Sequence, residues 1–188
     1  ARACMFRWAG FSRSGTVILI TVGGQMPFDR LVKTVDNWAA NHTGTRCFAQ
    51  IGPGGWRPRH MEWAEFLSPP VFREKLDNAS LVVAHAGMGT ILSALDLGKR
   101  LIVLPRLGHL RETRNDHQVA TAKRLEAMGL VVYATDEKHL FAKLAEPNRI
   151  EPRRSTSSFG SPQLISAVRT FILTPSDVFH PKDANGNT

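Results

Sequence analysis

The chain has 188 residues, 43% hydrophobic and 21% charged, which is enough for one globular domain and too little for two full ones. No apolar run is long enough to cross a bilayer, and only two cysteines, Cys4 and Cys47, argue against a disulfide framework or a cysteine metal site. The net charge of +8 favours an anionic partner, such as a phosphorylated ligand, a nucleic acid or an anionic lipid. We therefore expect a soluble domain in a reducing cytoplasm.

Three segments of the chain differ in composition. Residues 1–15 are rich in arginine and lack the apolar centre of a secretory signal, so we expect a flexible leader. Residues 16–148 carry regular apolar patterns and are predicted to form the folded domain. Residues 149–188 are rich in proline, serine, arginine and asparagine, which predicts a C-terminal extension with one helix near 164–173 and a loose tail.

Strand and helix signals alternate along the folded domain. Short apolar or β-branched runs predict strands at residues 16–22, 45–51, 61–67, 81–84, 101–104 and 130–133. Apolar residues at helical spacing predict helices at residues 28–38, 69–78, 90–97, 116–128 and 137–144. Strands separated by helices pair in parallel through crossover connections. The sequence therefore predicts an α/β fold, a single Rossmann-like domain with a parallel sheet and helices on both faces.

Single residues mark the ends of the predicted helices. Gly98 and Gly129 stand where a left-handed residue commonly ends a helix. Asp116 and Asp136 precede helical patterns and are expected to act as N-caps. In the first helix, Asp36 is spaced away from the apolar positions, so we expect its side chain to point away from the core.

The glycine-rich and polar turns of this chain all follow predicted strands. Ligands of open parallel sheets bind beyond the carboxyl ends of the strands. Four such segments follow strands, at residues 23–25, 52–55, 85–90 and 106–118. We therefore expect these segments to meet at one edge of the sheet and to form the binding site there.

The segment from His85 to Thr90 lies between a buried strand and a helix. Gly87 and Gly89 would let a ligand approach the backbone, and the N–H groups at the start of a helix attract phosphate. His85 is placed to donate to the same phosphate. A plain tight turn explains the glycines equally, because the segment lacks the lysine of a P-loop and the spacing of the dinucleotide fingerprint.

The polar run from Arg106 to Gln118 enters the next helix. Its charged and amide side chains suit the hydroxyls and charge of a sugar nucleotide, and a solvated loop with Asp116 as a plain N-cap explains the same pattern. Histidine pairs for zinc, the nucleophile elbow of hydrolases and an Asp-x-Asp metal motif do not occur in the sequence. We therefore expect neither a metal nor a cofactor.

The motifs together resemble the C-terminal, donor-binding half of family 28 glycosyltransferases of GT-B fold. The resemblance runs from about residue 16 to residue 136 and rests on residues 21–31, 82–91 and 114–118. Within that group the chain is similar to the small subunits of split enzymes, such as the PssE type of bacterial exopolysaccharide synthesis and the small subunit of the eukaryotic dolichol-linked UDP-GlcNAc transferase. The resemblance implies a UDP-sugar donor.

The resemblance also implies a role for individual residues. It places the turn at 23–25 near the diphosphate or sugar, His85 and the backbone of residues 87–90 on the phosphates, and Gln118 on the donor sugar or ribose. Many relatives place a glutamate on the ribose hydroxyls at the position of Ser93, where a serine offers one weaker hydrogen bond. The implied donor-binding residues are Gly23, Gly24, Gln25, His85, Gly87, Met88, Gly89, Thr90, Ser93, Arg106, Asn115, Asp116, His117 and Gln118.

A partner is implied as well. In complete GT-B enzymes the acceptor site, and usually the general base, come from the N-terminal domain. A membrane-associated subunit is therefore expected to bring a lipid-linked acceptor and to recruit this chain to the inner face of the membrane, while His85 is the best candidate base within the chain. The transferred sugar stays open among glucose, galactose, glucuronate and N-acetylglucosamine. Two alternatives also stay open: a non-catalytic nucleotide-sugar-binding or regulatory module and, on net charge alone, a nucleic-acid-binding protein.

Overall fold

The computed structural model describes residues 16–146, so the predicted leader and C-terminal extension lie outside the described residues. Within this range the strands are β1 (Val17–Thr21), β2 (Arg46–Gln50), β3 (Glu62–Ala64), β4 (Leu81–Ala84), β5 (Arg100–Val103) and β6 (Val132–Tyr133). The helices are α1 (Asp29–Ala39), α2 (Pro69–Asn78), α3 (Met88–Asp96), α4 (His117–Ala127) and α5 (Glu137–Ala145). None of these helices is long and apolar enough to span a bilayer.

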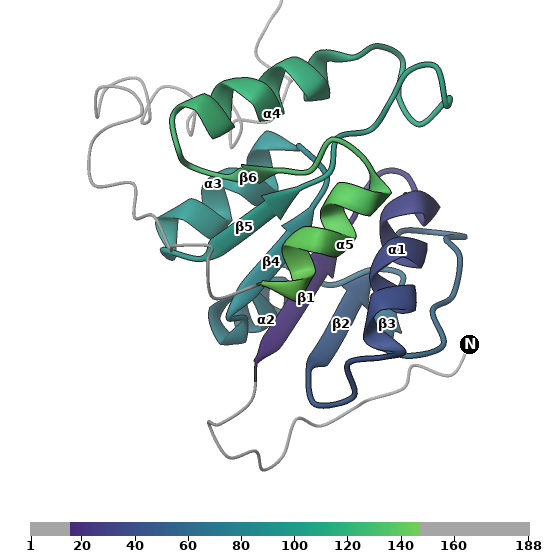
Figure 1. The fold of residues 1–188 in the computed structure, drawn as a ribbon. Helices are drawn as coiled ribbons and strands as arrows, with labels where there is room; N and C mark the ends of the chain where they lie inside the picture. The colour runs from purple at the N-terminus through teal and green to yellow at the C-terminus, as the bar shows by residue number, and fades with distance from the viewer. Residues whose placement is uncertain (1–15, 147–188) are drawn as a thin grey trace, which may run out of the picture. The chain divides into compact units, whose positions relative to one another are not determined.

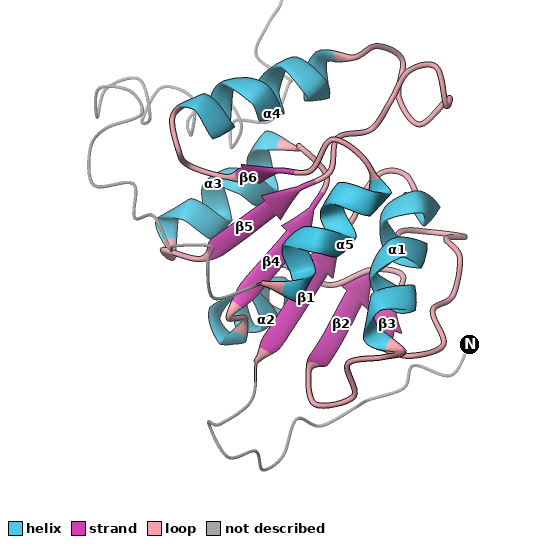
Figure 2. Cartoon of the chain, in the orientation of Figure 1, coloured by secondary structure: helices cyan, strands magenta, loops and turns pink. Residues whose placement is uncertain are grey.

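The strands form one parallel sheet in the order β3-β2-β1-β4-β5-β6. Helices α1 and α5 cover one face, and α2, α3 and α4 cover the other (Figures 1 and 2). The predicted fold, a Rossmann-like parallel sheet with helices on both faces, is confirmed.

Successive strand residues divide the core between the two faces of the sheet, because their side chains alternate. Ile20 packs with Leu31 of α1 and Leu140 of α5 on one face. Leu19 packs with Ile91 of α3 on the other face, and all of these side chains are fully buried. Each such burial stabilises the fold by about 1.5–3 kcal/mol. Burial on both faces explains why the strands read as continuous apolar runs.

The predicted helix ends are largely confirmed. Gly98 and Gly129 adopt positive φ angles of 61° and 67° directly after α3 and α4, which a residue with a side chain rarely tolerates. Asp136 caps α5, where its carboxylate accepts a hydrogen bond of 2.8 Å from the His139 N–H.

The predicted outward position of Asp36 is wrong, because the connection between β2 and β3 folds over α1. Asp36 is only 1% exposed, and its carboxylate accepts hydrogen bonds from the backbone N–H groups of Arg59 at 3.1 Å and His60 at 2.8 Å. About two turns earlier in α1, Asp29 accepts a 2.9 Å hydrogen bond from the Trp56 N–H. Two carboxylates of α1 thus hold this connection in place.

The sheet grows in opposite directions from the β1–β4 pair: β2 and β3 follow on the side of β1, and β5 and β6 follow on the side of β4. The connection after β1 leads to α1 on one face, and the connection after β4 leads to α3 on the other. Ligands of open α/β sheets bind at such a switch point, beyond the carboxyl ends of the strands. The four glycine-rich or polar segments predicted from the sequence all follow parallel strands, so they lie at this edge.

Candidate functional site

The imidazole of His85 lies between the two turns that flank the switch point. A Cβ atom added to Gly23 would lie 2.7 Å from Cε1 of His85, and one added to Gly87 would overlap its Nε2. Gly23 also has a positive φ of 82°. Glycine is therefore favoured at Gly23 by its backbone conformation, a side chain at Gly87 would displace the imidazole, and the structure brings together three of the predicted site residues.

His85 is held in its neutral form. Burial, and secondarily the positive charge of Arg106, lower the pKa of His85 from 6.5 to about 4. A neutral imidazole donates one hydrogen bond and carries no charge at neutral pH. Its Nδ1 is one of two buried side-chain nitrogens in residues 16–146 that lack a hydrogen-bond partner. So low a pKa does not favour the predicted role as general base, which works best with a pKa near the operating pH.

The start of α3 is open beside His85. Met88, Gly89 and Thr90 form the first turn, whose N–H groups have no partner inside a helix. Met88 and Gly89 are exposed, and a Cβ atom added to Gly89 would meet nothing within 4 Å. These N–H groups and the positive end of the helix dipole suit a phosphate.

Two polar residues, at the ends of β1 and β2, fix the turn that contains Gly23. The hydroxyl of Thr21 donates to Oε1 of Gln50 at 2.7 Å, and Nε2 of Gln50 donates to the carbonyl oxygen of Gly23 at 3.3 Å. The Gly23 N–H in turn donates to Oγ1 of Thr21 at 3.3 Å. Both side chains are buried, and sequence reasoning missed them. The available signal was a polar residue at the end of an otherwise apolar strand.

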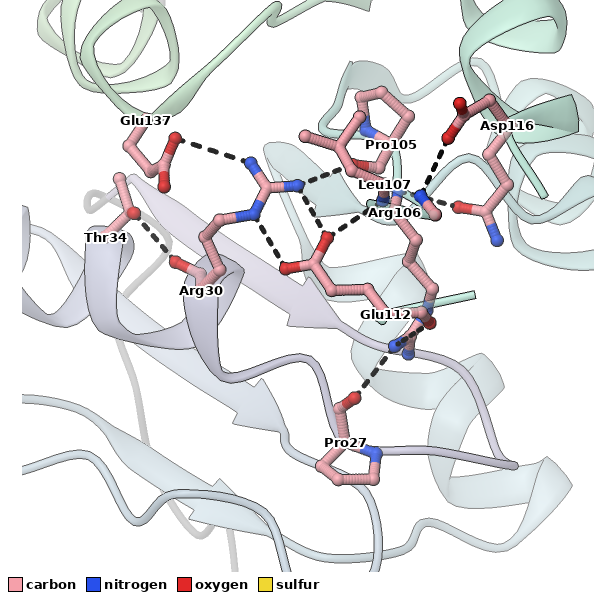
Figure 3. A network of polar contacts seen from close by, with 11 residues as sticks. Pro27, Arg30, Thr34, Pro105, Arg106, Leu107, Glu112, Asp116 and Glu137 are labelled. Carbon is pink, nitrogen blue, oxygen red and sulfur yellow. Dashed lines mark hydrogen bonds and ion pairs between the residues drawn. The ribbon is translucent and has the colours of Figure 1, made fainter. Parts of the chain in front are cut away.

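Arg106 points inward and is only 5% exposed. Its terminal nitrogens donate to the carbonyl oxygens of Val22 at 2.9 Å, Met26 at 2.8 Å and Pro27 at 2.8 Å. Its guanidinium carbon lies 4.7 Å from the centre of the Phe28 ring. Figure 3 shows this side chain reaching Pro27. The geometry therefore supports a contact with the turn after β1 rather than the predicted contact with the donor.

A second arginine, Arg30 of α1, contacts the loop between β5 and α4, which also contains Arg106. Arg30 donates from Nε and Nη2 to the two carboxylate oxygens of Glu112, at 2.8 and 2.9 Å, and from Nη2 to the Pro105 carbonyl oxygen at 2.8 Å (Figure 3). Glu112 also accepts a 2.9 Å hydrogen bond from the Leu107 N–H. A bidentate pair of this kind pairs the two charges and also holds the two side chains in a defined geometry. Sequence reasoning missed Arg30, because nothing local marks a partner 82 residues away.

The residues before and at the start of α4 are exposed. Asp116 stands at the N-cap position, but its side chain makes no capping hydrogen bond, so that prediction is wrong. Its Oδ1 instead accepts a 2.7 Å hydrogen bond from the Gly108 N–H, because the loop folds back over the helix start. Asn115 accepts hydrogen bonds from the backbone and ring of His117. Asn115 and His117 thus contact each other, and Asp116 contacts the backbone of its own loop, all at the surface.

Gln118 and Ser93 occupy different surroundings. Gln118 is 8% exposed, and its Oε1 accepts a 3.1 Å hydrogen bond from the backbone N–H of Arg106. Ser93 lies one turn into α3, where its hydroxyl donates to the Gly89 carbonyl oxygen at 2.8 Å. Its oxygen can still accept a hydrogen bond. The donor contacts predicted for these two residues stay predictions.

The predicted residues fall into two groups. The inner rim consists of Gly23, His85, Gly87, Met88, Gly89 and Thr90. The outer rim consists of Asn115, Asp116 and His117. Gly24 and Gln25 continue the first turn and are exposed. Gln118, next to the outer rim in sequence, accepts a hydrogen bond from the Arg106 N–H, and Arg106 donates to the carbonyl oxygen of Val22, next to Gly23.

The sheet order and the placement of the turns define a Rossmann-like α/β domain with its ligand edge at the β1–β4 switch point. The model of the glycosyltransferase family 28 C-terminal domain matches residues 17–162, which is more than half of the chain. The chain therefore belongs to that family. The matched region extends past residue 148, where the folded domain was predicted to end.

The chain is similar to subunits named ALG13 in several organisms. It is 33% identical over 96 residues to the human UDP-N-acetylglucosamine transferase subunit ALG13, covering 48% of this chain and 8% of that protein. It is 24% identical over 125 residues to the Yarrowia lipolytica subunit of the same name, covering 58% of this chain and 60% of that protein. The chain thus spans less than two thirds of these relatives.

Two solved structures share the fold. The NMR solution structure of ALG13 has a TM-score of 0.56 and 22% identity, covering 81% of this chain and 94% of that chain. The crystal structure of Os79 from O. sativa in complex with UDP has a TM-score of 0.54 and 15% identity, covering 70% and 31%. The predicted membership of family 28 is confirmed, whereas the likeness to the PssE type stays a prediction.

Proposed function

We propose that this chain is the donor-binding subunit of a UDP-sugar-dependent glycosyltransferase. The observation that carries the proposal is the inner rim, where His85 lies between two glycines beside the open start of α3, in a chain of family 28. This is a site for a diphosphate at the switch point of the sheet. The relatives named UDP-N-acetylglucosamine transferase subunits support a UDP-sugar as its source.

In the proposed complex, the diphosphate oxygens accept hydrogen bonds from the N–H groups of Met88, Gly89 and Thr90. His85 adds one neutral hydrogen bond. The ribose lies toward Ser93, and the sugar lies toward Gln118 and the outer rim. Arg111 and Arg114 are exposed in the same loop and supply positive charge near the ligand.

The proposed reaction is an inverting glycosyl transfer. An acceptor hydroxyl oxygen forms a bond to the anomeric carbon while the bond from that carbon to the diphosphate oxygen breaks, and UDP leaves with the electron pair. The proton of the hydroxyl passes to a base on the partner, since His85 is a weak base at neutral pH. This chain stabilises the negative charge that develops on UDP through preorganised N–H groups.

The proposed partner is a membrane-associated subunit that holds a lipid-linked acceptor for polysaccharide or glycan synthesis. The word "subunit" in the names of the ALG13 relatives supports an assembly. The chain would then work in the cytoplasm, at the inner face of the membrane. The donor named for these relatives makes UDP-N-acetylglucosamine the first sugar nucleotide to test.

Calorimetric titration of the purified chain with UDP, and with ATP as the control, tests the proposal. We expect saturable binding of UDP and none of ATP. Equal binding of both nucleotides, or no binding of UDP by a folded chain, would contradict a UDP-sugar site. Titration with UDP-N-acetylglucosamine, UDP-glucose and UDP-glucuronate then ranks the donors.

A further inference from the structure

Arg106 occupies the point where several parts of the proposed site meet. Its Nη2 donates to the carbonyl oxygen of Val22, before the turn after β1, and to that of Met26, near the end of this turn. Its Nη1 donates to the carbonyl oxygen of Pro27. One buried guanidinium therefore holds both ends of the turn that contains Gly23.

The terminal nitrogens of Arg106 are directed at backbone carbonyl oxygens. Nη2 donates to Val22 and Met26 at 2.9 and 2.8 Å, and Nη1 donates to Pro27 at 2.8 Å and lies 3.5 Å from the Glu112 carbonyl oxygen. These acceptors and the adjacent Phe28 ring compensate the burial of the charge.

The backbone of Arg106 is fixed from the opposite side. Its N–H donates to the Gln118 side chain of α4, and the carbonyl oxygen of the preceding residue, Pro105, accepts a hydrogen bond from Arg30 of α1. The side chain thus extends from an anchored backbone to the turn after β1. Because His85 packs against Gly23 of that turn, the position of Arg106 also determines where His85 lies.

We propose that Arg106 is a positioning residue that holds residues 23–27 and His85 in the geometry that binds the donor, and that it does not contact the donor itself. This inference rests on the proposed binding of a UDP-sugar. A lysine cannot replace the arginine, because its single ammonium group lacks the planar fork that reaches several carbonyl oxygens at once. A residue that only paired with a phosphate would tolerate lysine better.

The experiment compares Arg106→Lys and Arg106→Met with wild type and with a control, Arg73→Lys. NMR order parameters of Gly24, Gln25 and Met26 report the rigidity of the turn, and UDP affinity is measured as a function of salt concentration. In both Arg106 variants we expect these order parameters to fall from about 0.85 to below about 0.6. We also expect UDP affinity to fall by about tenfold or more. The control changes an exposed arginine of α2, which pairs with Asp77 at 3.4 Å outside this network, and should leave the turn ordered.

The charge-conserving variant separates positioning from charge. If Arg106 holds the turn, Arg106→Lys loses UDP affinity about as strongly as Arg106→Met at every salt concentration, because both variants lack the fork. Wild-type UDP affinity in Arg106→Lys, or an ordered turn in both variants, would each overturn the proposal. If wild type fails to bind UDP, the proposed function fails, and the order parameters still decide whether Arg106 holds the turn.

A structure of the wild-type chain with UDP decides the matter without any variant, should the substitutions prevent folding. Guanidinium hydrogen bonds to the Val22, Met26 and Pro27 carbonyl oxygens uphold the proposal. A guanidinium hydrogen-bonded to a phosphate oxygen overturns it.

Discussion

The inner and outer rims of the proposed site are built in different ways. In the inner rim, His85 is enclosed by glycine backbones, and the turn at Gly23 is fixed by buried side chains. In the outer rim, Asn115, Asp116 and His117 are exposed and contact mainly their own loop. A rigid site suits a ligand group that is the same in every donor, whereas exposed side chains can adapt to a group that differs between donors. We therefore expect the inner rim to bind the diphosphate common to all donors, and the outer rim to contact the variable sugar.

The largest effect should come from Gly87→Ala. The new methyl group overlaps Nε2 of His85, so the imidazole and the start of α3 must move apart. We expect UDP affinity to fall by about a hundredfold, or about 3 kcal/mol, as measured by calorimetry. The matched variant Gly89→Ala keeps its N–H and adds a methyl group in open space, so its loss should be much smaller. Equal losses would show that the inner rim is not closely packed in the complex.

In the proposed complex, replacing His85 by alanine would remove one hydrogen bond to the diphosphate while leaving the helix start in place. We expect a loss of UDP affinity of about 1.5–3 kcal/mol, with an unchanged circular dichroism spectrum. The exposed His109→Ala serves as the control for the loss of a histidine. Unchanged UDP affinity in a folded His85→Ala variant would remove His85 from the site.

The enclosure of His85 should also appear as a dependence of stability on pH. The folded-state pKa of about 4 lies below the ordinary 6.5, so the unfolded chain binds more protons between these values. The stability that depends on a neutral His85 is present above about pH 6.5 and is lost as pH falls toward 4. Between pH 7 and 4.5, wild type should lose up to about 3 kcal/mol more unfolding free energy than His85→Gln in urea titrations. Parallel pH profiles would show that His85 is not held neutral.

The smallest effect on UDP affinity should come from a substitution in the outer rim. Asp116→Ala removes a surface hydrogen bond to the Gly108 N–H and should lower the unfolding free energy by about 0.5–1 kcal/mol. Asp136→Ala, which removes a true N-cap outside the site, should lower the unfolding free energy without changing UDP affinity. Affinity for UDP alone should change little in Asp116→Ala. A loss of UDP affinity as large as that of Gly87→Ala would erase the distinction between the two rims.

The sequence predicts the architecture because the relevant signals are local. Apolar runs identify the strands, helical spacing identifies the helices, and Gly98 and Gly129 end α3 and α4 as expected. The order of the strands in the sheet is not encoded in this way, since order along the chain leaves it open. The same holds for Asp36, whose place in the helical period suggests an exposed position although a distant loop covers it.

The site is predictable only in part, for the same physical reason. The parallel strands bring Gly23, His85 and Gly87 together, so their place at one edge follows from the pattern. The direction of the Arg106 side chain and its partners depends on the path of a long polar loop. No periodicity describes that path, and the pair of Arg30 and Glu112, 82 residues apart, helps to fix it.

Because α1 anchors the connection between β2 and β3, this connection shows where the protein can accept inserted residues. Near its start, the N–H of Gly52 donates to the Glu65 carbonyl oxygen at 3.1 Å, and its later residues are held by the two carboxylates of α1. The tip at Pro53 and Gly54 is exposed between these anchors. Lengthening a surface loop costs little when its ends stay fixed. The tip is therefore a place where residues can be inserted, by evolution or by design, without moving the β1–β4 switch point.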